Sequence, residues 1–526
     1  MEVALHMSDP APMDTTAPDT APDAAAAETA PDAADSRAQV DGTPAFRRCL
    51  EAVRLNDTCF ASWSLLVAEA ERSRNPLLGD VYERLLATFP PLYGYWAKAA
   101  RHCDQVGAAL AIFERGVEAT KHASVDLWAK YAAYAVEKNG QGDIDPAACR
   151  AILDRAQGAC KYDPRSPLVN DLVVAYETDP ARQLATARVA IASARATDAA
   201  ECGFSGRDEA LEQLTALAEA APVSACKDAD TFLCEVAEQS NKAAAEDRKR
   251  APFERRIRRP YFHSKPLDED QLRTWRAYLD WEEDAGDQER TKHLYERCLV
   301  ACCSYPEFWC RYASYVSPSS SENAVAVLDR GLQFLKHAPD LLLLKAALLE
   351  AKGDVDGARL VHESLTDGAP GLLEAVLAHA RFERRCGSRE DVLAIYKGAL
   401  PRLDAGSDAR GLVQAALARF QLHVLRDADA ARQTLEASIR EAPQCRELWV
   451  AYYALEASSE DAAAPKRVSA LFSAALDDST QLPAASQKAL WSLYLQHVED
   501  LGPEIGHLLE VREAHAGWLR KTGQLA

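Results

Sequence analysis

The stretch that decides the fold begins Trp275-Arg276-Ala277-Tyr278-Leu279-Asp280-Trp281-Glu282 and continues, after a polar break at Gly286, into Tyr295-Glu296-Arg297. The three rings of the first part are spaced by three residues, which places them along one face of an α-helix. The second part has helical apolar periodicity and carries an acid next to a base. The stretch therefore predicts two consecutive helices that pack through an aromatic face.

This two-helix pattern recurs along the chain. The tryptophans that lead a first helix are Trp63, Trp96, Trp128, Trp275, Trp309, Trp449 and Trp491. The second-helix signature, an aromatic or aliphatic residue followed by an acid and Arg, reads Tyr82-Glu83-Arg84, Phe113-Glu114-Arg115, Leu153-Asp154-Arg155 and Leu328-Asp329-Arg330. The steps from Trp63 to Trp96, from Trp96 to Trp128 and from Trp275 to Trp309 are nearly equal. Each is close to the period of roughly 34 residues that marks helical-repeat solenoids.

We therefore predict an all-α fold, an α-α superhelix of such repeats in two arrays. One helix pair cannot hide its apolar face, whereas stacked pairs bury it continuously. We expect each Trp to pack between the helices of its own unit. We also expect the Glu that closes a first helix (Glu69, Glu282, Glu456) to pair with the signature Arg of the second helix.

Composition and periodicity divide the chain into four segments. Residues 1–45 repeat Ala, Pro, Asp and Thr and hold nine acids against one base, Arg37, so we expect a disordered acidic tail. Residues 46–197 are predicted to form an N-terminal array, and residues 268–526 a C-terminal array. Residues 198–267, where the repeat signal is weak, are predicted to be a helical joint that ends in a basic strap.

The composition argues against several classes of protein. A net charge of −20 disfavours a general nucleic-acid coat, because phosphates would be repelled on average. No apolar run is long enough for a membrane span, and the start shows no secretory signal pattern. Gly-rich phosphate loops and the G-x-S-x-G and H-E-x-x-H motifs are also missing. We expect no enzyme activity, no catalytic or cofactor-binding residues, and no small-molecule substrate.

Four closely spaced cysteines raise the question of a zinc site. Cys298, Cys302, Cys303 and Cys310 follow helical period, and no second ligand pair has zinc-site spacing. Scattered cysteines in a chain of this size are typical of reduced, buried thiols. We interpret the four as core residues and expect no metal site.

One strongly basic cluster precedes the C-terminal array. Its members are Arg248, Lys249, Arg250, Arg255, Arg256, Arg258 and Arg259. It could contact RNA phosphates or an acidic partner, or direct nuclear import. It could equally be a solvated helix face followed by a structural turn.

An extended segment follows the basic cluster, because residues before proline avoid the helix. Its residues are Arg259, Pro260, Tyr261, Phe262, His263, Pro266 and Leu267. The segment could be a strap that docks a partner. We favour a strap packed on its own solenoid with Tyr261 and Phe262 buried, since two adjacent rings and a fixed turn suit intramolecular packing.

The C-terminal end carries apolar residues with no following repeat to cover them. They are Trp491, Tyr494, Leu495, Leu508, Leu509, Val511 and Trp518. A terminal repeat needs a polar cap or a partner. We predict a dimer surface here, with a self-capping final helix as the alternative.

The tryptophan-led first helix and the Tyr/Phe-Glu-Arg second helix resemble the half-a-TPR (HAT) repeat of RNA-processing scaffolds. A more specific run lies at the joint: Phe253-Glu254-Arg255-Arg256-Ile257-Arg258-Arg259-Pro260-Tyr261-Phe262-His263-Ser264-Lys265-Pro266-Leu267. It resembles the signature of the pre-mRNA-processing factor 39 family. The match continues through Gln271-Leu272, Trp275, Tyr278-Leu279, Glu282, Gly286, Glu296-Arg297-Cys298 and Phe308-Trp309. The acidic tail and the aliphatic units between 340 and 440 depart from that family's pattern.

The resemblance implies a nuclear splicing scaffold associated with the U1 small nuclear ribonucleoprotein (U1 snRNP), which pairs with the 5′ splice site. It implies U1 snRNP proteins as partners and dimerisation, with itself or a paralogue, through the C-terminal repeats. RNA contact would be secondary. The alternatives are another HAT-repeat scaffold, of the crooked-neck or cleavage-stimulation type, and a direct RNA-binding protein that uses the cluster at 248–259.

Overall fold

The computed structural model describes residues 43–177 and 248–522, apart from residues 58, 264, 370, 460, 462, 478, 479 and 503. It forms two compact units, residues 1–88 and 89–526. The first unit holds α1 (Pro44–Leu55), α2 (Phe60–Ser73) and α3 (Leu78–Thr88). α1 packs on α2 and α2 on α3. The unit thus contains one tryptophan-led pair, α2 and α3, preceded by a single helix.

The second unit begins with five helices of the N-terminal array. They are α4 (Tyr93–His102), α5 (Val106–Ala119), α6 (Val125–Gly140), α7 (Pro146–Cys160) and α8 (Pro167–Tyr176). Each helix packs on the next, and alternate helices also touch, as α4 and α6 do. This is the packing of a solenoid, in which every pair supplies one wall of its neighbour's core.

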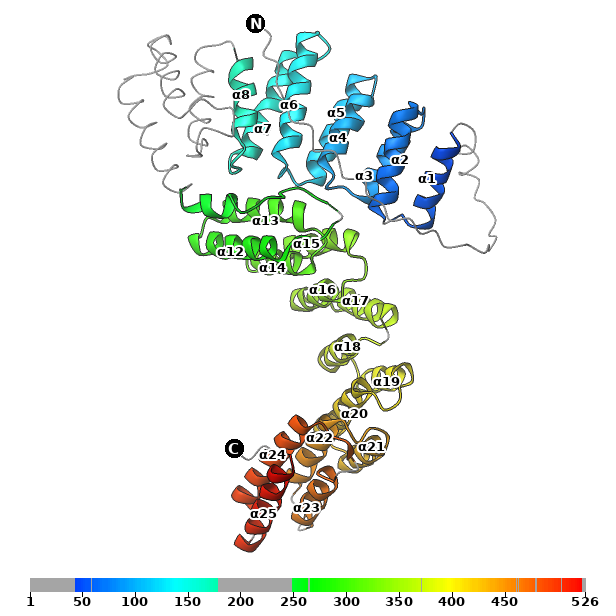
Figure 1. Cartoon of the computed structure of the whole chain (residues 1–526), viewed down its shortest axis with the longest axis vertical. Helices are drawn as coiled ribbons and strands as arrows, with labels where there is room; N and C mark the ends of the chain where they lie inside the picture. Colours follow the sequence, from blue (N-terminus) through cyan, green and yellow to red (C-terminus); the bar gives the residue numbers. More distant parts are fainter. Residues whose placement is uncertain are drawn as a thin grey trace. The chain divides into compact units, whose positions relative to one another are not determined.

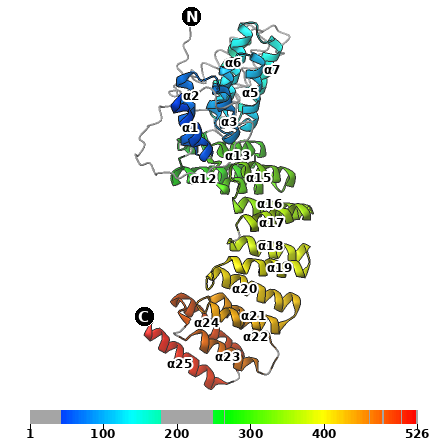
Figure 2. The same ribbon diagram turned by 90° about the vertical axis from the view of Figure 1, so that its right-hand side faces the viewer.

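The described chain resumes with a helix at residues 248–254 and then the C-terminal array. Its first half is α12 (Glu269–Ala285), α13 (Gln288–Cys302), α14 (Pro306–Val316), α15 (Ser321–Phe334), α16 (Pro339–Lys352), α17 (Val355–Gly368), α18 (Leu373–Cys386) and α19 (Arg389–Ala399). Its second half is α20 (Asp408–Phe420), α21 (Ala428–Glu441), α22 (Arg446–Ala457), α23 (Ala464–Ala475), α24 (Ala484–Leu501) and α25 (Ile505–Lys521). A short 3₁₀ turn, η1 (Leu400–Arg402), follows α19, and a π-helical turn, η2 (Gln421–Leu425), follows α20. Figures 1 and 2 show α16 to α23 following one another as stacked pairs.

The predicted all-α solenoid is confirmed, since the described residues form helices and turns and contain no strand. One boundary was wrong. The predicted tail was to run to residue 45, but α1 begins at Pro44, because the Thr43 side chain caps the helix by accepting from the Phe46 amide (3.1 Å). Residues 1–42 and most of the predicted joint, residues 198–247, lie outside the described residues.

Short polar caps set the helix ends. Asp145 and Ser388 accept backbone hydrogen bonds at the starts of α7 and α19, and Ser388 forms a capping box with Asp391. Gly286 closes α12 and Gly353 closes α16, both with positive φ (80° and 88°). A left-handed residue at this place suits glycine, which carries no Cβ.

Four signature tryptophans pack in the core and also hold the turn that precedes their helix. The indole N–H groups of Trp63, Trp96, Trp309 and Trp449 each donate to the backbone carbonyl six residues earlier, at 2.6 to 2.8 Å. All four rings are buried. One side chain therefore fixes both the helix packing and the path of the preceding turn.

The cysteines of the C-terminal array lie where the sequence placed them. Cys298, Cys302 and Cys303 are buried in the core, and Cys310 is half-buried. Burial raises the pKa of the Cys303 thiol to about 12. Within the described ranges, no group of three or more His, Cys, Asp or Glu side chains could hold a metal ion. None of the helices there is both long and apolar enough to cross a membrane.

Candidate interaction site at the junction of the arrays

A recurring cluster joins several second helices to the next repeat. The Glu114 carboxylate on α5 accepts from the Tyr131 hydroxyl on α6 (2.6 Å) and from both terminal nitrogens of Arg155 on α7 (2.8 Å each). The Arg155 guanidinium lies over the Trp128 ring, 5.5 Å from its centroid. Phe113 stacks on Tyr131, with ring centroids 4.9 Å apart. The residue types of the two sequence signatures thus meet across three successive helices.

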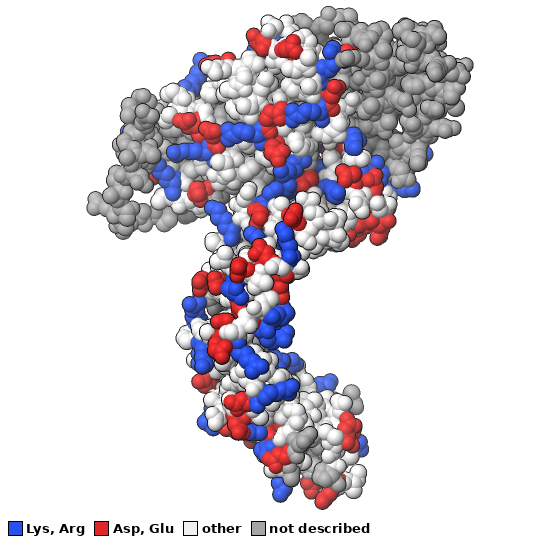
Figure 3. Space-filling view, turned by 180° about the vertical axis from the view of Figure 1, so that it is seen from behind, with Lys and Arg blue, Asp and Glu red and all other residues white. Residues whose placement is uncertain are grey.

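The C-terminal array repeats this cluster. Glu254 accepts from the Tyr278 hydroxyl (2.9 Å) and from Arg297 (2.9 and 3.1 Å). Glu296 accepts from Arg330 in the same bidentate way (3.0 and 2.7 Å). The Glu of one second helix therefore binds the Arg of the next second helix, which explains why both residues recur in the signature. Figure 3 shows basic and acidic side chains lying next to one another on much of the face it draws.

The glutamates that close the first helices bind a different set of arginines. Each pairs with an arginine of the preceding second helix: Glu177 with Arg150, Glu282 with Arg250, Glu383 with Arg359 and Glu456 with Arg432. All four glutamates are buried. Glu456 also binds Arg467 of α23 (2.5 Å), the second helix of its own unit, as predicted. Glu282 also binds an arginine of its own second helix, but this is Arg290 (3.6 Å), so the predicted pairing with the signature Arg297 is wrong. Glu69 instead pairs with Arg72 of its own helix (2.8 Å).

The two arrays of the second unit meet at a buried ion pair. Asp163, in the turn after α7, lies with its Oδ2 atom 2.9 Å from Arg297 Nε on α13. Its Oδ1 atom accepts from the Arg165 amide (2.8 Å), and Arg165 in turn binds Asp126 on α6 (2.6 Å). Arg297 of the C-terminal array thus binds Asp163 of the N-terminal array and Glu254 of the helix at 248–254 at once.

The electrostatics of this pair keep both groups charged. Burial would raise the pKa of the Asp163 carboxyl, but the Arg297 and Arg165 guanidiniums hold that pKa well below its usual range. The Arg297 side chain is only 7% exposed and is satisfied by two carboxylates. A buried charge of this kind is tolerated only with complete pairing, so each partner depends on the other.

Aromatic contacts extend the junction on both sides of the ion pair. Tyr162 meets His293 of α13 edge-on (5.9 Å between centroids), and the Arg290 guanidinium lies over the Tyr162 ring (5.5 Å). Phe89, at the start of the second unit, packs on Phe262 of the strap (6.0 Å). A cavity of about 300 Å³ is lined by residues of both arrays. Its lining includes Pro90 and Lys121 of the N-terminal array and Val300, Trp309 and Phe334 of the C-terminal array.

Hydrogen bonds hold the strap and the residues just before it against the C-terminal array. The Gln271 amide side chain accepts from the Arg258 N–H (2.9 Å) and donates to the Arg256 carbonyl (2.6 Å). The Leu267 N–H donates to the Tyr305 hydroxyl (2.6 Å), and Arg259 donates to the Lys265 carbonyl (2.8 Å). The strap therefore follows a fixed path into α12.

The strap's rings face different ways. Phe262 is half-buried against the core of the C-terminal array, whereas Tyr261 is 42% exposed. His263 accepts from the Lys265 amide through Nδ1 (2.9 Å), while Pro260 is half-buried and Pro266 exposed. The expectation that Tyr261 and Phe262 are both buried was therefore wrong for Tyr261. Its ring lies on the surface of the junction.

The predicted basic cluster divides into buried and exposed members. Arg250 is buried and binds Glu282 through two nitrogens (3.0 Å each), with its guanidinium over the Trp281 ring. It is a structural residue and is not available to RNA or to a partner. The exposed members are Arg248, Lys249, Arg255, Arg256 and Arg258, while Arg259 is half-buried. Phe253 stacks on Tyr278 (5.1 Å), so residues 248–254 occupy the place of a second helix before α12.

The C-terminal end is largely covered by its own last helix. Trp491, Tyr494 and Val511 are buried, and Leu495, Leu508 and Trp518 are half-buried against the same core. Of the predicted dimer surface, only Leu509 is openly exposed, at 59%. Two residues that the sequence argument missed, Leu501 (64%) and Ile505 (72%), are also exposed at this end.

Sequence reasoning also missed the ion pair at the junction. Asp163 precedes Pro164 in a short turn, a context typical of any polar loop. Nothing local distinguishes it, because its partner Arg297 lies in a distant part of the sequence. The signature pairing of Arg297 with a Glu could be inferred from the repeat, but its second carboxylate could not.

Comparison with known proteins agrees with these features. Residues 47–192 match the family model of the PRP39 N-terminal HAT repeat, and residues 248–385 match that of the PRP39 C-terminal HAT repeat. The chain is 28% identical to pre-mRNA-processing factor 39 of Schizosaccharomyces pombe over 462 residues, covering 77% of this chain and 74% of the relative. It is 25% identical to the Homo sapiens protein of that name over 534 residues, covering 92% and 79%.

A solved structure shares the fold. The crystal structure of CstF-77 superimposes with a TM-score of 0.54 at 11% identity, covering 82% of this chain and 89% of that chain. At this identity the likeness concerns the α-α solenoid alone. The two family models cover most of the N-terminal array and the first part of the C-terminal array, and the run at 253–267 that resembles the family's signature is built into the junction between them. The chain belongs to the PRP39 family of HAT-repeat proteins.

Proposed function

We propose that this protein is a non-catalytic scaffold of pre-mRNA splicing that acts in the nucleus, associates with the U1 snRNP and takes part in 5′ splice-site recognition. The observation that carries the proposal is the pair of PRP39 models, which match residues 47–192 and 248–385. Relatives named pre-mRNA-processing factor 39 match over most of their length, which supports a role in pre-mRNA processing.

The geometry supports a scaffold role. The recurring charges of the repeats are used within the chain, as in the Glu114–Arg155 and Glu296–Arg330 pairs, and the Asp163–Arg297 pair fastens one array to the other. Such a solenoid has a defined path and presents its surfaces in fixed relation. Its work would be the arrangement of U1 snRNP proteins, with no covalent step.

The proposal includes a dimer, of the chain with itself or with a paralogue, formed through the C-terminal repeats. Leu501, Ile505 and Leu509 lie within one turn-and-helix segment at the end of α24 and in α25, and all are exposed. Exposed apolar groups that gather at the end of a solenoid are typical of a contact with another chain.

Direct RNA binding is the second candidate function. The exposed residues Arg248, Lys249, Arg255, Arg256 and Arg258 favour it, because such a cluster attracts phosphates. The net charge of −20 and the withdrawal of Arg250 into the core weaken it. We therefore expect RNA contact to be secondary to protein contact.

The test is to purify the tagged full-length chain, at mild salt, from cells that express it and to identify the RNA that comes with it. The proposal predicts enrichment of U1 RNA over the other spliceosomal RNAs and over a tag-only control. Equal recovery of all spliceosomal RNAs, or of none, would contradict the U1 assignment. Purified chain titrated with U1 RNA at several salt concentrations separates the candidates, since direct binding would weaken steeply with salt.

A further inference from the structure

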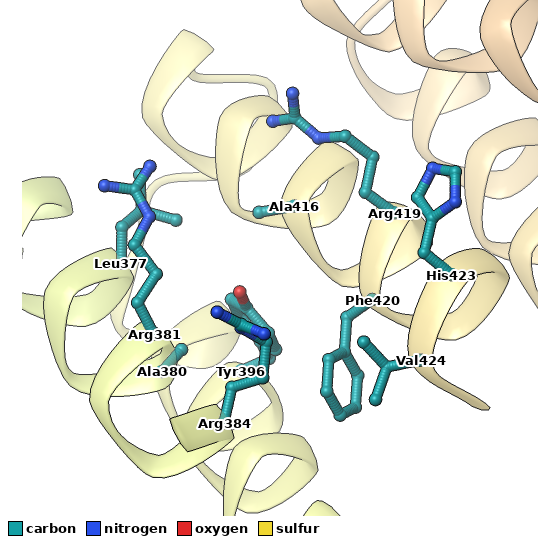
Figure 4. A pocket seen from close by; sticks show the side chains of 10 residues that line it. All are labelled: Leu377, Ala380, Arg381, Arg384, Tyr396, Ala416, Arg419, Phe420, His423 and Val424. Atoms are coloured by element: carbon teal, nitrogen blue, oxygen red, sulfur yellow. The ribbon is translucent and has the colours of Figure 1, made fainter.

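A groove with a basic rim crosses the middle of the C-terminal array. It has a volume of about 360 Å³ and lies between α18, α19, α20 and η2. Figure 4 shows Arg381 and Arg384 on one side and Arg419 and His423 on the other. The remaining lining residues are Leu377, Ala380, Tyr396, Ala416, Phe420 and Val424.

The charges on the rim are uncompensated. Arg381, Arg384 and Arg419 are exposed, and none of the three has an ion-pair partner among the described residues. This differs from arginines close by in the chain: Arg359 binds Glu383, Arg385 binds Glu350 and Arg410 binds Glu441. No acid lines the groove. The net charge of the chain is −20, so three unpaired guanidiniums around one groove stand out, and they favour the binding of a negatively charged ligand.

The floor of the groove is apolar and closed. The rings of Tyr396 and Phe420 are 6% and 5% exposed, and Ala380 is also buried. Burial raises the pKa of the Tyr396 hydroxyl, while Arg381, Arg419 and Arg384 act in the opposite direction, which fits guanidiniums gathered above this ring. The rings are too deeply buried to stack on a nucleic-acid base.

The far wall depends on an irregular turn. After Phe420 the helix α20 continues as the π-helical turn η2, which ends at Leu425 and is followed by Arg426 with a positive φ of 60°. This turn brings His423 and Val424 to the groove. π-helical turns are rare and are frequent at functional sites.

We infer that this groove binds a short acidic amphipathic segment of a protein partner, with one or two apolar side chains on the floor and carboxylates on Arg381, Arg384 and Arg419. Arginine binds carboxylates in bidentate fashion, and a helix that lays its apolar face into a groove is a common recognition mode. A nucleic acid fits less well. Its phosphates could contact the arginines, but its bases would find no accessible ring to stack on. The chain's own residues 1–42 are acidic but carry few large apolar groups for the floor.

The experiment uses the full chain and fluorescein-labelled probes, followed by fluorescence anisotropy. The main probe is a synthetic peptide of about four helical turns, with Leu and Phe on one face and Glu on the other. Three comparison probes are the same peptide with Lys in place of Glu, a peptide with the sequence of residues 14–35 of this chain, and an oligouridylate. We expect the acidic peptide to bind with a Kd of roughly 10 to 100 µM, and the other probes to bind at least about ten times more weakly.

Charge reversal locates the binding. Arg384→Glu and Arg419→Glu should each weaken binding of the acidic peptide by about tenfold or more. Arg440→Glu makes the same change in net charge at a side chain that is 79% exposed outside the groove, and should leave binding unchanged. Thermal melts of all three variants should overlay the parent, since the rim arginines make no ion pair within the described residues and the Arg440–Glu436 contact is long (3.9 Å).

The inference is overturned if the parent chain does not bind the acidic peptide, or if Arg384→Glu and Arg419→Glu bind it as the parent does. Tighter binding of the oligouridylate would make the groove a nucleic-acid site, and tighter binding of the 14–35 peptide would make it a site for the chain's own tail. Either result contradicts a protein partner.

Discussion

The Asp163 carboxylate and the Arg297 guanidinium meet at 2.9 Å in the interior of the second unit, one from the turn after α7 and the other from α13. Arg297 also binds Glu254, so a single side chain joins the N-terminal array, the helix at 248–254 and the C-terminal array. Arg297, a signature residue of the repeat, thus also holds the two arrays together where they meet.

Removal of either partner should loosen this junction. Arg297→Leu should lower the free energy of unfolding of the second unit by about 3 to 5 kcal/mol, because it takes the guanidinium away from the buried Asp163 carboxylate and from Glu254. Asp163→Asn should lower it by less, because Arg297 keeps Glu254 as a partner. The double variant should cost less than the sum of the two. Urea unfolding followed by circular dichroism measures this. Glu499→Gln, which breaks a largely exposed pair with Arg512, is the control and should cost under about 1 kcal/mol. Equal losses for control and junction variants would contradict the role given to the ion pair.

The same pair predicts a dependence on pH. In the folded chain the pKa of Asp163 lies well below its usual range, whereas in the unfolded chain the carboxyl takes up a proton near pH 4. Its contribution to stability is therefore complete above about pH 5 and is lost as the pH falls below about 4. The difference in unfolding free energy between the parent and Asp163→Asn should shrink over this range. A difference that stays constant from pH 6 to pH 3 would show that Asp163 is not held ionised.

A buried histidine gives a second effect of pH at a different place. Burial and the neighbouring His379 lower the pKa of His362 to about 4, and the two rings stack with centroids 5.5 Å apart. Near pH 5 His362 is protonated in the unfolded chain but neutral in the folded chain. The free energy of unfolding therefore decreases as the pH falls from about 6.5 to about 4. His362→Phe keeps a ring at this position and should show a smaller drop in Tm from pH 7 to pH 5. An unchanged drop would rule out His362 as the cause.

The close approach of paired helices can be tested at a glycine. A Cβ at Gly331 on α15 would lie 2.7 Å from Leu341 Cδ2 and 2.9 Å from Trp309 Cδ2, so Gly331→Ala should cost about 1 to 3 kcal/mol. Gly158 on α7 has nothing within 4 Å of an added Cβ. Gly158→Ala should instead stabilise the chain by roughly 0.5 to 1 kcal/mol, because alanine favours the helix. Thermal or urea unfolding gives both values, and effects of the same sign would contradict the packing described.

The proposed dimer can be tested at its exposed apolar side chains. Ile505→Glu and Leu509→Glu should convert a dimer into a monomer at micromolar concentration, as measured by sedimentation or light scattering. Leu360→Glu is the matched control, since Leu360 on α17 is also exposed (66%) but lies outside the last two helices. A parent chain that is already monomeric at micromolar concentration would contradict the dimer.

The sequence predicted the repeat because its signal is local. Rings at spacings of three and a recurring Tyr-Glu-Arg triplet define helix faces without knowledge of the fold, and the structure confirms the helices they predict. Contacts between repeats were harder to predict. Glu282 and the signature Arg297 share a two-helix unit, so their pairing was a reasonable hypothesis, but solenoid stacking places each of them against the preceding helix at 248–254 instead.

Exposure was the other quantity that the sequence could not supply. In the sequence Arg250 resembles the basic residues around it, yet in the structure it is buried against Glu282. In the sequence Arg381, Arg384 and Arg419 are typical of any solvated helix face, yet in the structure they gather around one groove. At the C-terminal end, Trp491 packs against Trp518 of the last helix, which periodicity alone could not distinguish from an open surface.

We propose that this scaffold serves U1-dependent recognition of the 5′ splice site. The most direct test of this claim is to deplete the protein from a splicing-competent nuclear extract and to follow, on native gels, the first U1-containing complex on a labelled pre-mRNA. We expect the complex to be reduced on depletion and restored by the parent chain, with weaker restoration by Arg297→Leu. Formation of the complex at an unchanged rate in the depleted extract would contradict the claim.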